Sequence, residues 1–145
     1  MSYDPNNVFA KILRGAAPCI KVFENQMTLV FMDIMPQADG HLLIIPKESA
    51  SQIFELSEGA AAACMLTARK AAIAVKTALK PPGIILAQAN GSAAGQTVPH
   101  YHIHVIPRHS GVFLAPHATQ QEDMEKLKQL AERIIAAWPE CDESN

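Results

Sequence analysis

The sequence is short of cysteine, of excess charge and of long apolar runs, and each shortage excludes a class of protein. Its three cysteines, Cys19, Cys64 and Cys141, form no CxxC pair and leave one unpaired in any connectivity, which argues against a secreted disulfide framework. The 12 basic and 14 acidic residues give a net charge of −2, so a polymeric nucleic acid, whose phosphates require a basic surface, is not an expected partner. No segment approaches the roughly 18 apolar residues of a membrane span, and no secretory signal is visible. We therefore expect a soluble cytoplasmic protein without a membrane partner.

The sequence does contain enough apolar residues for one folded domain. Its 145 residues are 49% hydrophobic, which is typical of a single domain with its own core. Apolar residues at three- and four-residue spacing predict helices, and short β-rich runs between turn residues predict strands. Expected helices cover residues 8–13, 58–80 and 119–138, and expected strands cover residues 20–24, 28–33, 41–45, 83–89 and 100–106. Thr119 and Glu122 have capping-box spacing at the start of the last helix. Helices segregated from hairpin-forming strands favour the α+β class with an antiparallel sheet.

Three of the six histidines fall within five residues, at His100, His102 and His104. Alternate residues of a strand share one face, so a strand here would present three imidazoles together while Tyr101 and Ile103 point to a core. Imidazole is a poor filler for a purely structural strand, because it is partly charged near its unperturbed pKa of about 6.5. The triplet therefore indicates a functional site.

Two chemistries fit aligned imidazoles: metal binding and nucleophilic catalysis. Alternate residues of a strand are about 6.6–7 Å apart, so the first and third histidines are too distant to share one tetrahedral ion without distortion. The preceding segment, Asn90–Thr97, is a loop of small residues whose backbone N–H groups can approach a ligand closely. Hydrogen-bond donors beside nucleophiles, with little positive charge nearby, favour a site for one phosphate.

The residues around the triplet are similar to the signature of the histidine triad (HIT) family of nucleotide hydrolases and transferases. Residues 95–108 carry the pattern His-φ-His-φ-His-φ-φ, in which φ is apolar, after a Gly-Gln-Thr loop. Residues 8–14 resemble the family's opening helix, and residues 31–38 and 40–47 resemble its central segment. The resemblance covers about residues 6–108, nearest the nucleotide-binding (HINT-like) branch, and the helical extension at about 119–138 resembles bacterial members. It implies one HIT-like domain over 1–145, with about five antiparallel strands, a long central helix, a short N-terminal helix and a C-terminal helix.

This resemblance implies cleavage at the α-phosphorus of a purine nucleotide conjugate, either a nucleoside phosphoramidate or a dinucleoside polyphosphate. His102 matches the nucleophile, which forms a nucleotidyl-histidine intermediate that water hydrolyses. His104 matches the residue that contacts the phosphate and assists the leaving group, while His100 and His41 match supporting histidines. No cofactor is implied. The alternative is a non-catalytic nucleotide-binding or scaffold protein that keeps the same pocket.

The resemblance also implies a nucleotide-binding site. Asp33 matches the ribose-hydroxyl acceptor, and Gln96 and Thr97 match phosphate contacts within a loop that includes Gly95 and Asn90. The purine-base pocket is matched by Val8, Phe9, Ile12, Phe31 and Ile34, for which ordinary core packing is nearly as good an interpretation.

The chain departs from the family pattern at two positions. Ala89 stands where the family often has an amide side chain, and the neighbouring amide, Asn90, would point to the opposite face of a strand. Pro99 stands where the family often has a bulky residue. The cysteine and histidine ligands that give some relatives a bound zinc are not evident, so no metal ligands are predicted. A homodimer is expected from the family, and the Ala-rich helix at 58–80 is suited to pack closely against a copy of itself.

Overall fold

The computed structural model describes residues 2–116 and 120–139, and its centre is an antiparallel sheet of five strands. The strands are β1 (Lys21–Glu24), β2 (Thr28–Met32), β3 (Leu42–Pro46), β4 (Gly83–Ala87) and β5 (Ile103–Arg108). Their order across the sheet is β1-β2-β3-β5-β4, and every neighbouring pair is antiparallel. The α+β class and the five-stranded sheet expected from the sequence are confirmed.

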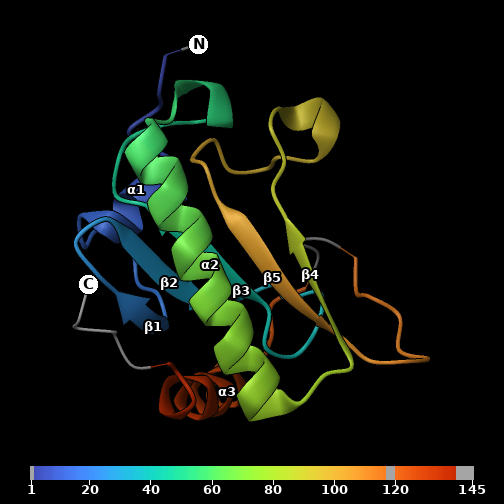
Figure 1. Ribbon diagram of the computed structural model, residues 1–145. Coiled ribbons are helices and arrows are strands. Elements are labelled where there is room, and N and C mark those ends of the chain that lie inside the picture. Colours follow the sequence, from blue (N-terminus) through green and yellow to red (C-terminus); the bar gives the residue numbers. More distant parts are fainter. Residues whose placement is uncertain (1, 117–119, 140–145) are drawn as a thin grey trace.

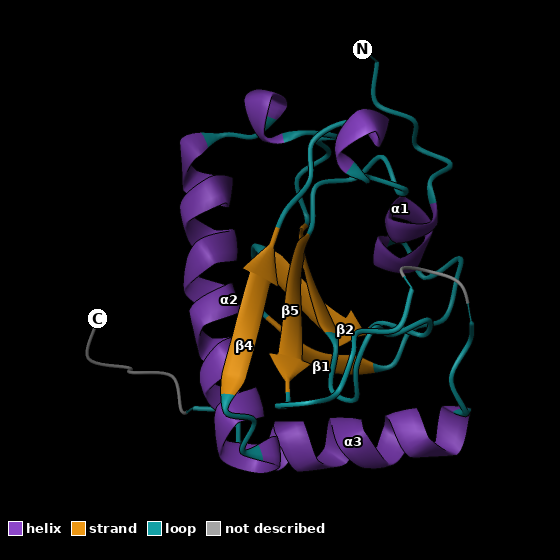
Figure 2. Ribbon diagram, turned by 90° about the vertical axis from the view of Figure 1, so that its right-hand side faces the viewer, coloured by secondary structure: helices purple, strands orange, loops and turns teal. Residues whose placement is uncertain are grey.

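Three α-helices surround the sheet: α1 (Val8–Leu13), α2 (Glu58–Leu79) and α3 (Met124–Ala136). In Figures 1 and 2, α2 runs along one face of the sheet, α1 lies on the opposite side, and α3 crosses the lower end. Two 3₁₀ turns, η1 (Ile53–Glu55) and η2 (Ser92–Ala94), lie near the end of the sheet opposite α3. The face next to α1 carries the cavity that is described below.

Strand residues alternate between two hydrophobic clusters because side chains of a strand point to opposite faces in turn. On the face next to α2 the buried strand residues pack with α2 and α3; they are Val30, Met32, Leu42, Ile44, Ile103 and Val105. On the other face Leu29, Phe31, Leu43 and Ile45 pack with Phe9 of α1. Both faces of β2 and β3 are covered, which explains why these strands read as continuous apolar runs.

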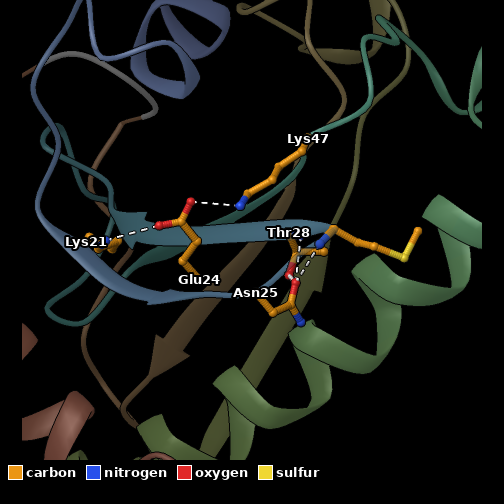
Figure 3. A network of polar contacts seen from close by, with 6 residues as sticks. Lys21, Glu24, Asn25, Thr28 and Lys47 are labelled. Atoms are coloured by element: carbon orange, nitrogen blue, oxygen red, sulfur yellow. Dashed lines mark hydrogen bonds and ion pairs between the residues drawn. The ribbon is translucent and has the colours of Figure 1, made fainter.

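Side chains at turns and helix starts form hydrogen bonds with backbone groups that would otherwise lack partners. Asn7 caps α1 by accepting a hydrogen bond from the Ala10 N–H at 2.8 Å, and Ser57 caps α2. In the β1–β2 hairpin the Asn25 carboxamide oxygen accepts from both the backbone N–H and the hydroxyl of Thr28, while Glu24 pairs with Lys47 at 2.8 Å (Figure 3). These local contacts set the register of the sheet edge.

The structure corrects two predicted boundaries. The strand expected over 100–106 begins at Ile103 and continues to Arg108, because the Tyr101 N–H bonds to the Ala50 carbonyl instead of a neighbouring strand. The last helix begins at Met124 with Asp123 as its N-cap, so the capping box predicted from Thr119 and Glu122 does not start it. Thr119 itself and residues 140–145 lie outside the described residues.

Within the described ranges, no helix has the length and apolar character needed to cross a bilayer. The cytoplasmic location expected from the sequence stays a prediction. Cys64 lies in the core with no exposed surface, and burial raises the pKa of its thiol to about 12.

Candidate active site

A cavity of about 180 Å³ opens between α1 and the face of the sheet that carries the histidines. Its apolar wall includes Val8, Phe9 and Ile12 from α1, and Phe31 from β2. Drug-sized ligands usually occupy cavities of roughly 300–1,000 Å³, so this cavity has room for one flat ring system rather than a whole nucleotide. His102 and His104 line the same cavity, which places any group attached to the ring system beside the imidazoles.

The ring of His102 is held in one orientation. Its Nδ1 atom lies 2.7 Å from the backbone carbonyl oxygen of His100, and a carbonyl only accepts hydrogen bonds. The Nδ1 atom must therefore carry the proton, which leaves the lone pair of the neutral ring on Nε2. Phe9 meets the His102 ring edge-on, with ring centroids 5.0 Å apart and an angle of 89° between the planes. The sequence-predicted nucleophile thus has the tautomer that nucleophilic attack from Nε2 requires.

His100 is fully buried and lies outside the cavity lining. Its Nε2 atom lies 2.9 Å from the Pro46 carbonyl oxygen, and its Nδ1 atom lies 2.5 Å from the Tyr3 hydroxyl. Burial lowers the pKa of His100, although the bond to Pro46 opposes this shift. His100 is therefore a neutral imidazole that links the segments containing Tyr3 and Pro46.

His41 and His104 are hydrogen-bonded to each other. Leu43 of β3 pairs with His104 of β5, which brings His41, two residues before Leu43, close to His104. His41 Nε2 lies 2.9 Å from His104 Nδ1. The Gln37 backbone N–H donates to His41 Nδ1 at 3.0 Å, so His41 carries its proton on Nε2. That proton is donated to His104 Nδ1, and His104 then carries its own proton on Nε2. This hydrogen bond therefore sets the tautomers of both rings.

Asp33 lies at the end of β2, where its carboxylate is shared between two roles. One oxygen, Oδ1, accepts from the Met35 N–H at 2.9 Å and closes a turn, while the other, Oδ2, lies 3.5 Å from His41 Nε2. The Asp33 N–H also bonds to the His41 carbonyl at 3.0 Å. Asp33 lines the cavity, so the position predicted for a ribose acceptor is next to the space for the base.

The loop before the triplet differs from its expected role as a set of phosphate donors. The Gln96 side chain donates to the Ser51 and Val98 carbonyls and accepts from the Gly91 N–H, so all of its polar atoms bond to backbone. The Gly95 and Gln96 N–H groups bond within the loop. Of the predicted phosphate contacts only Thr97 lines the cavity. Phosphate contact by Gln96 or Gly95 stays a prediction, and it would require these bonds to break.

Asn90 also faces away from the cavity lining. Its carboxamide oxygen accepts from the Ile53 N–H at 2.8 Å, and its amide pairs with the Gln88 side chain. With Ala89 at the preceding position, the side-chain amides here tie the loop to η1.

Most of the predicted binding residues line the cavity, together with residues that were not predicted. Val8, Phe9, Ile12, Phe31, Asp33, Ile34, Thr97, His102 and His104 line it, whereas His41, His100, Gly95, Gln96 and Asn90 do not. The residues that the sequence reasoning missed are Pro18, Cys19, Met32, Met35, Leu43 and Val98. Leu43 had a detectable signal, because strand alternation places it on the same face as Ile45. Burial raises the pKa of the Cys19 thiol at the cavity wall.

Asp33, His41 and His104 also have the spacing of a metal-ligand group. Their potential ligand atoms lie within 4.8 Å of one another, unlike the three histidines of the triplet that we considered from the sequence. In this structure His41 Nε2 and His104 Nδ1 are hydrogen-bonded to each other.

Comparison with known proteins finds relatives of this chain. A family profile described as the HIT domain matches residues 14–111. The adenosine 5'-monophosphoramidase hnt1 of Schizosaccharomyces pombe is 40% identical over 101 residues, covering 70% of this chain and 73% of that protein. The adenylylsulfatase HINT3 of Arabidopsis thaliana is 34% identical over 129 residues, covering 89% of this chain and 66% of that protein.

A crystal structure of a Hit-like protein from Bartonella henselae, described as involved in cell-cycle regulation, superposes with a TM-score of 0.90. It is 39% identical, and the match covers 94% of this chain and 99% of that chain.

Proposed function

The chain belongs to the HIT domain family, and from this premise we propose that it is a nucleotide hydrolase or transferase. Its substrate is a purine nucleotide conjugate, either a nucleoside phosphoramidate or a dinucleoside polyphosphate. It cleaves the conjugate at the α-phosphorus through a nucleotidyl intermediate on His102. The observation that carries this proposal is the hydrogen bond from His102 Nδ1 to the His100 carbonyl, at the edge of an apolar cavity of ring size.

The proposed first step uses the two tautomers described above. The His102 Nε2 lone pair attacks the α-phosphorus, and a P–N bond to His102 forms as the bond to the leaving group breaks. An amine that carries an extra proton on its nitrogen departs as the neutral amine with the bonding electron pair. The His104 Nε2–H donates a hydrogen bond to this leaving group and keeps its proton, and the His41–His104 hydrogen bond holds that tautomer. The product at this stage is a nucleotidyl-imidazole with its Nδ1 proton still held by the His100 carbonyl.

In the second step water attacks the same phosphorus and the P–N bond to His102 breaks. The water proton goes to the released leaving group, the electron pair of the P–N bond returns to His102 Nε2, and the nucleoside monophosphate leaves. The base rests against the apolar cavity wall and the ribose hydroxyls bond to Asp33, which together hold the phosphorus in line with Nε2. Thr97 lines the cavity, unlike Gly95, Gln96 and Asn90, which supports a contact between Thr97 and the phosphate.

The test is trapping of the intermediate. Wild-type protein mixed with excess adenosine 5'-phosphoramidate and quenched early gains the mass of one nucleotidyl group, on the peptide that contains His102. His102→Ala loses turnover by more than about a thousandfold, because the covalent route is removed. His109→Ala is the matched control: His109 is an exposed histidine outside the cavity lining, and its variant keeps full activity.

Two results would contradict the proposal. Full turnover by His102→Ala would exclude the covalent mechanism. Tight mononucleotide binding with no turnover of phosphoramidates or diadenosine polyphosphates would favour the alternative of a non-catalytic nucleotide-binding or scaffold protein. The ratio of kcat/KM for the two substrate classes then identifies the leaving group that the site prefers.

We also propose that the chain forms a homodimer through β4 and α2. β4 is an edge strand of the sheet, and edge strands offer unpaired backbone groups to a partner. Ile85 and Leu86 of β4 are exposed, as are Met65 and Leu66 of the adjoining α2. Sedimentation velocity is expected to give a dimer for the wild type and a monomer for Leu86→Glu. A wild-type monomer at micromolar concentration would exclude this assembly.

A further inference from the structure

The side chain of Tyr3 reaches the histidine triplet from a distant part of the sequence. Its hydroxyl lies 2.5 Å from His100 Nδ1, across a separation of 97 residues. The two rings meet edge-on, with centroids 5.6 Å apart and an angle of 68° between the planes. Tyr3 is half-buried, in the extended segment before α1, and it belongs to no motif recognised in the sequence.

The direction of this hydrogen bond follows from the other partner of His100. The Pro46 carbonyl can only accept, so the bond at 2.9 Å places the His100 proton on Nε2. A neutral imidazole then has a lone pair on Nδ1, and this atom is buried with the rest of the ring. The Tyr3 hydroxyl donates to that lone pair. Burial also lowers the pKa of His100 and keeps the ring neutral, so the lone pair is present.

We propose that Tyr3 is a positioning residue of the triplet, whose hydroxyl locks His100 as the Nε2–H tautomer and thereby holds the ring of His102. The coupling runs through one backbone group. The His100 carbonyl accepts the Nδ1 proton of His102 at 2.7 Å, so any movement of residue 100 moves the acceptor that orients His102. His100 is thus held from two sides by Tyr3 and Pro46.

Loss of the Tyr3 hydroxyl leaves a buried acceptor without its donor. The His100 ring can satisfy its Nδ1 atom by rotating, by admitting water, or by moving its proton to Nδ1. In the last case Nε2 and the Pro46 carbonyl would face each other as two acceptors. Each of these changes displaces residue 100. The displacement alters the His102 orientation, while the cavity wall of Val8, Ile12 and Phe31 stays in place.

The N-terminal segment has other anchors that do not touch His100. The Asn6 N–H donates to Asp4 Oδ1 at 2.9 Å, and the Asn7 side chain donates to the Asp4 carbonyl at 2.7 Å. Asp4→Ala removes the first of these bonds and loosens the segment, but it retains the phenol. This variant separates a specific effect of the Tyr3 hydroxyl from a general loosening of the N-terminus.

The test compares Tyr3→Phe, Asp4→Ala and the wild type with adenosine 5'-phosphoramidate as substrate. This kinetic arm rests on the proposed function. Tyr3→Phe is expected to lower kcat by about tenfold, as for loss of one hydrogen bond to a buried group, while KM stays within about twofold because the base pocket is intact. Asp4→Ala is expected to change both constants by less than about twofold.

The second readout needs no substrate. Long-range ¹H–¹⁵N spectra of the free protein report the protonation of each imidazole nitrogen. In Tyr3→Phe the His100 Nδ1 signal is expected to move to the frequency of an imidazole nitrogen without a hydrogen bond, and the His102 Nδ1 signal is expected to shift with it. In Asp4→Ala both signals stay at the wild-type frequency.

The outcomes are decisive in either direction. Unchanged His100 and His102 signals in Tyr3→Phe, or an equal loss of kcat in Asp4→Ala, would overturn the positioning role. If the wild type itself has no turnover, the proposed function fails, and the spectra alone then decide whether Tyr3 sets the His100 tautomer and the His102 ring. Thermal unfolding of each variant shows that the comparison is made on folded protein.

Discussion

Replacement of Gly40 by alanine is expected to damage both stability and catalysis, because Gly40 lies where the loop that follows Asp33 enters β3. Its φ of +91° is in a region that side chains disfavour. A methyl group there would overlap Leu79 Cδ1 at the end of α2 and come within 3.3 Å of Pro107 Cγ. The next residue, His41, donates the hydrogen bond that sets the His104 tautomer, and its carbonyl accepts from the Asp33 N–H.

The size of the effect follows from two separate costs. A left-handed backbone at a non-glycine residue costs roughly 1–2 kcal/mol. Overpacking costs roughly 1–3 kcal/mol, and the lower end applies here because the end of the Leu79 side chain can turn away, whereas the Pro107 ring moves less. Gly40→Ala should therefore reduce the free energy of unfolding by about 2–4 kcal/mol.

Urea unfolding of the wild type and four variants, Gly40→Ala, Gly15→Ala, Leu79→Ala and the double variant of Gly40 and Leu79, separates the two costs. Gly15→Ala is the matched control, because Gly15 has a φ of +77° and nothing within 4 Å of an added Cβ, so this variant shows the backbone cost alone. Leu79→Ala combined with Gly40→Ala should recover about 1 kcal/mol relative to the sum of the single changes, since the overlap is removed. kcat/KM of Gly40→Ala is expected to fall by about tenfold through displacement of His41.

Equal destabilisation by Gly40→Ala and Gly15→Ala would refute the packing part of this reasoning. A Gly40→Ala protein as stable as the wild type would refute all of it. Loss of stability with unchanged kcat/KM would show that the His41 position does not depend on the turn.

Three further predictions follow from buried or capping groups. Burial lowers the pKa of His100 below its ordinary value of 6.5. The neutral ring therefore adds stability that is complete above about pH 6.5 and declines as the pH falls towards the lower pKa of the folded state. Urea titrations at several pH values should show this decline, and His100→Gln should weaken it. Alkylation in a Cys141→Ser background should leave Cys64 unmodified until the protein unfolds. Cys19, at the cavity wall, should react slowly and be protected by adenosine monophosphate. Equal alkylation rates of Cys19 with and without the nucleotide would place the nucleotide elsewhere. Asp123→Ala should lower the free energy of unfolding by about 1 kcal/mol, measured by thermal or urea unfolding, because the α3 N-cap that bonds to the Lys126 N–H is lost. A change below the error of the measurement would show that water replaces the cap.

Local patterns were sufficient for most of the fold. The apolar runs of β2 and β3 are visible in the sequence, and residues suited to N-caps, Asn7 and Ser57, stand directly before α1 and α2, because strand periodicity and capping depend on neighbouring residues only. The α3 start was misplaced because Thr119, like the actual cap Asp123, is a residue type that caps helices. A local rule cannot choose between two adjacent segments that both satisfy it.

The sequence by itself predicted the class of fold, which is confirmed, and a functional site at the histidine triplet. The chemistry of His102 stays a prediction. Only the tertiary structure decided the tautomer of His100, because its partners Pro46 and Tyr3 are distant from it in the sequence. It also decided that Gln96 bonds to the Ser51 carbonyl. Hydrogen bonds between residues that are distant in sequence depend on how whole elements pack, and no periodicity or short motif records that packing.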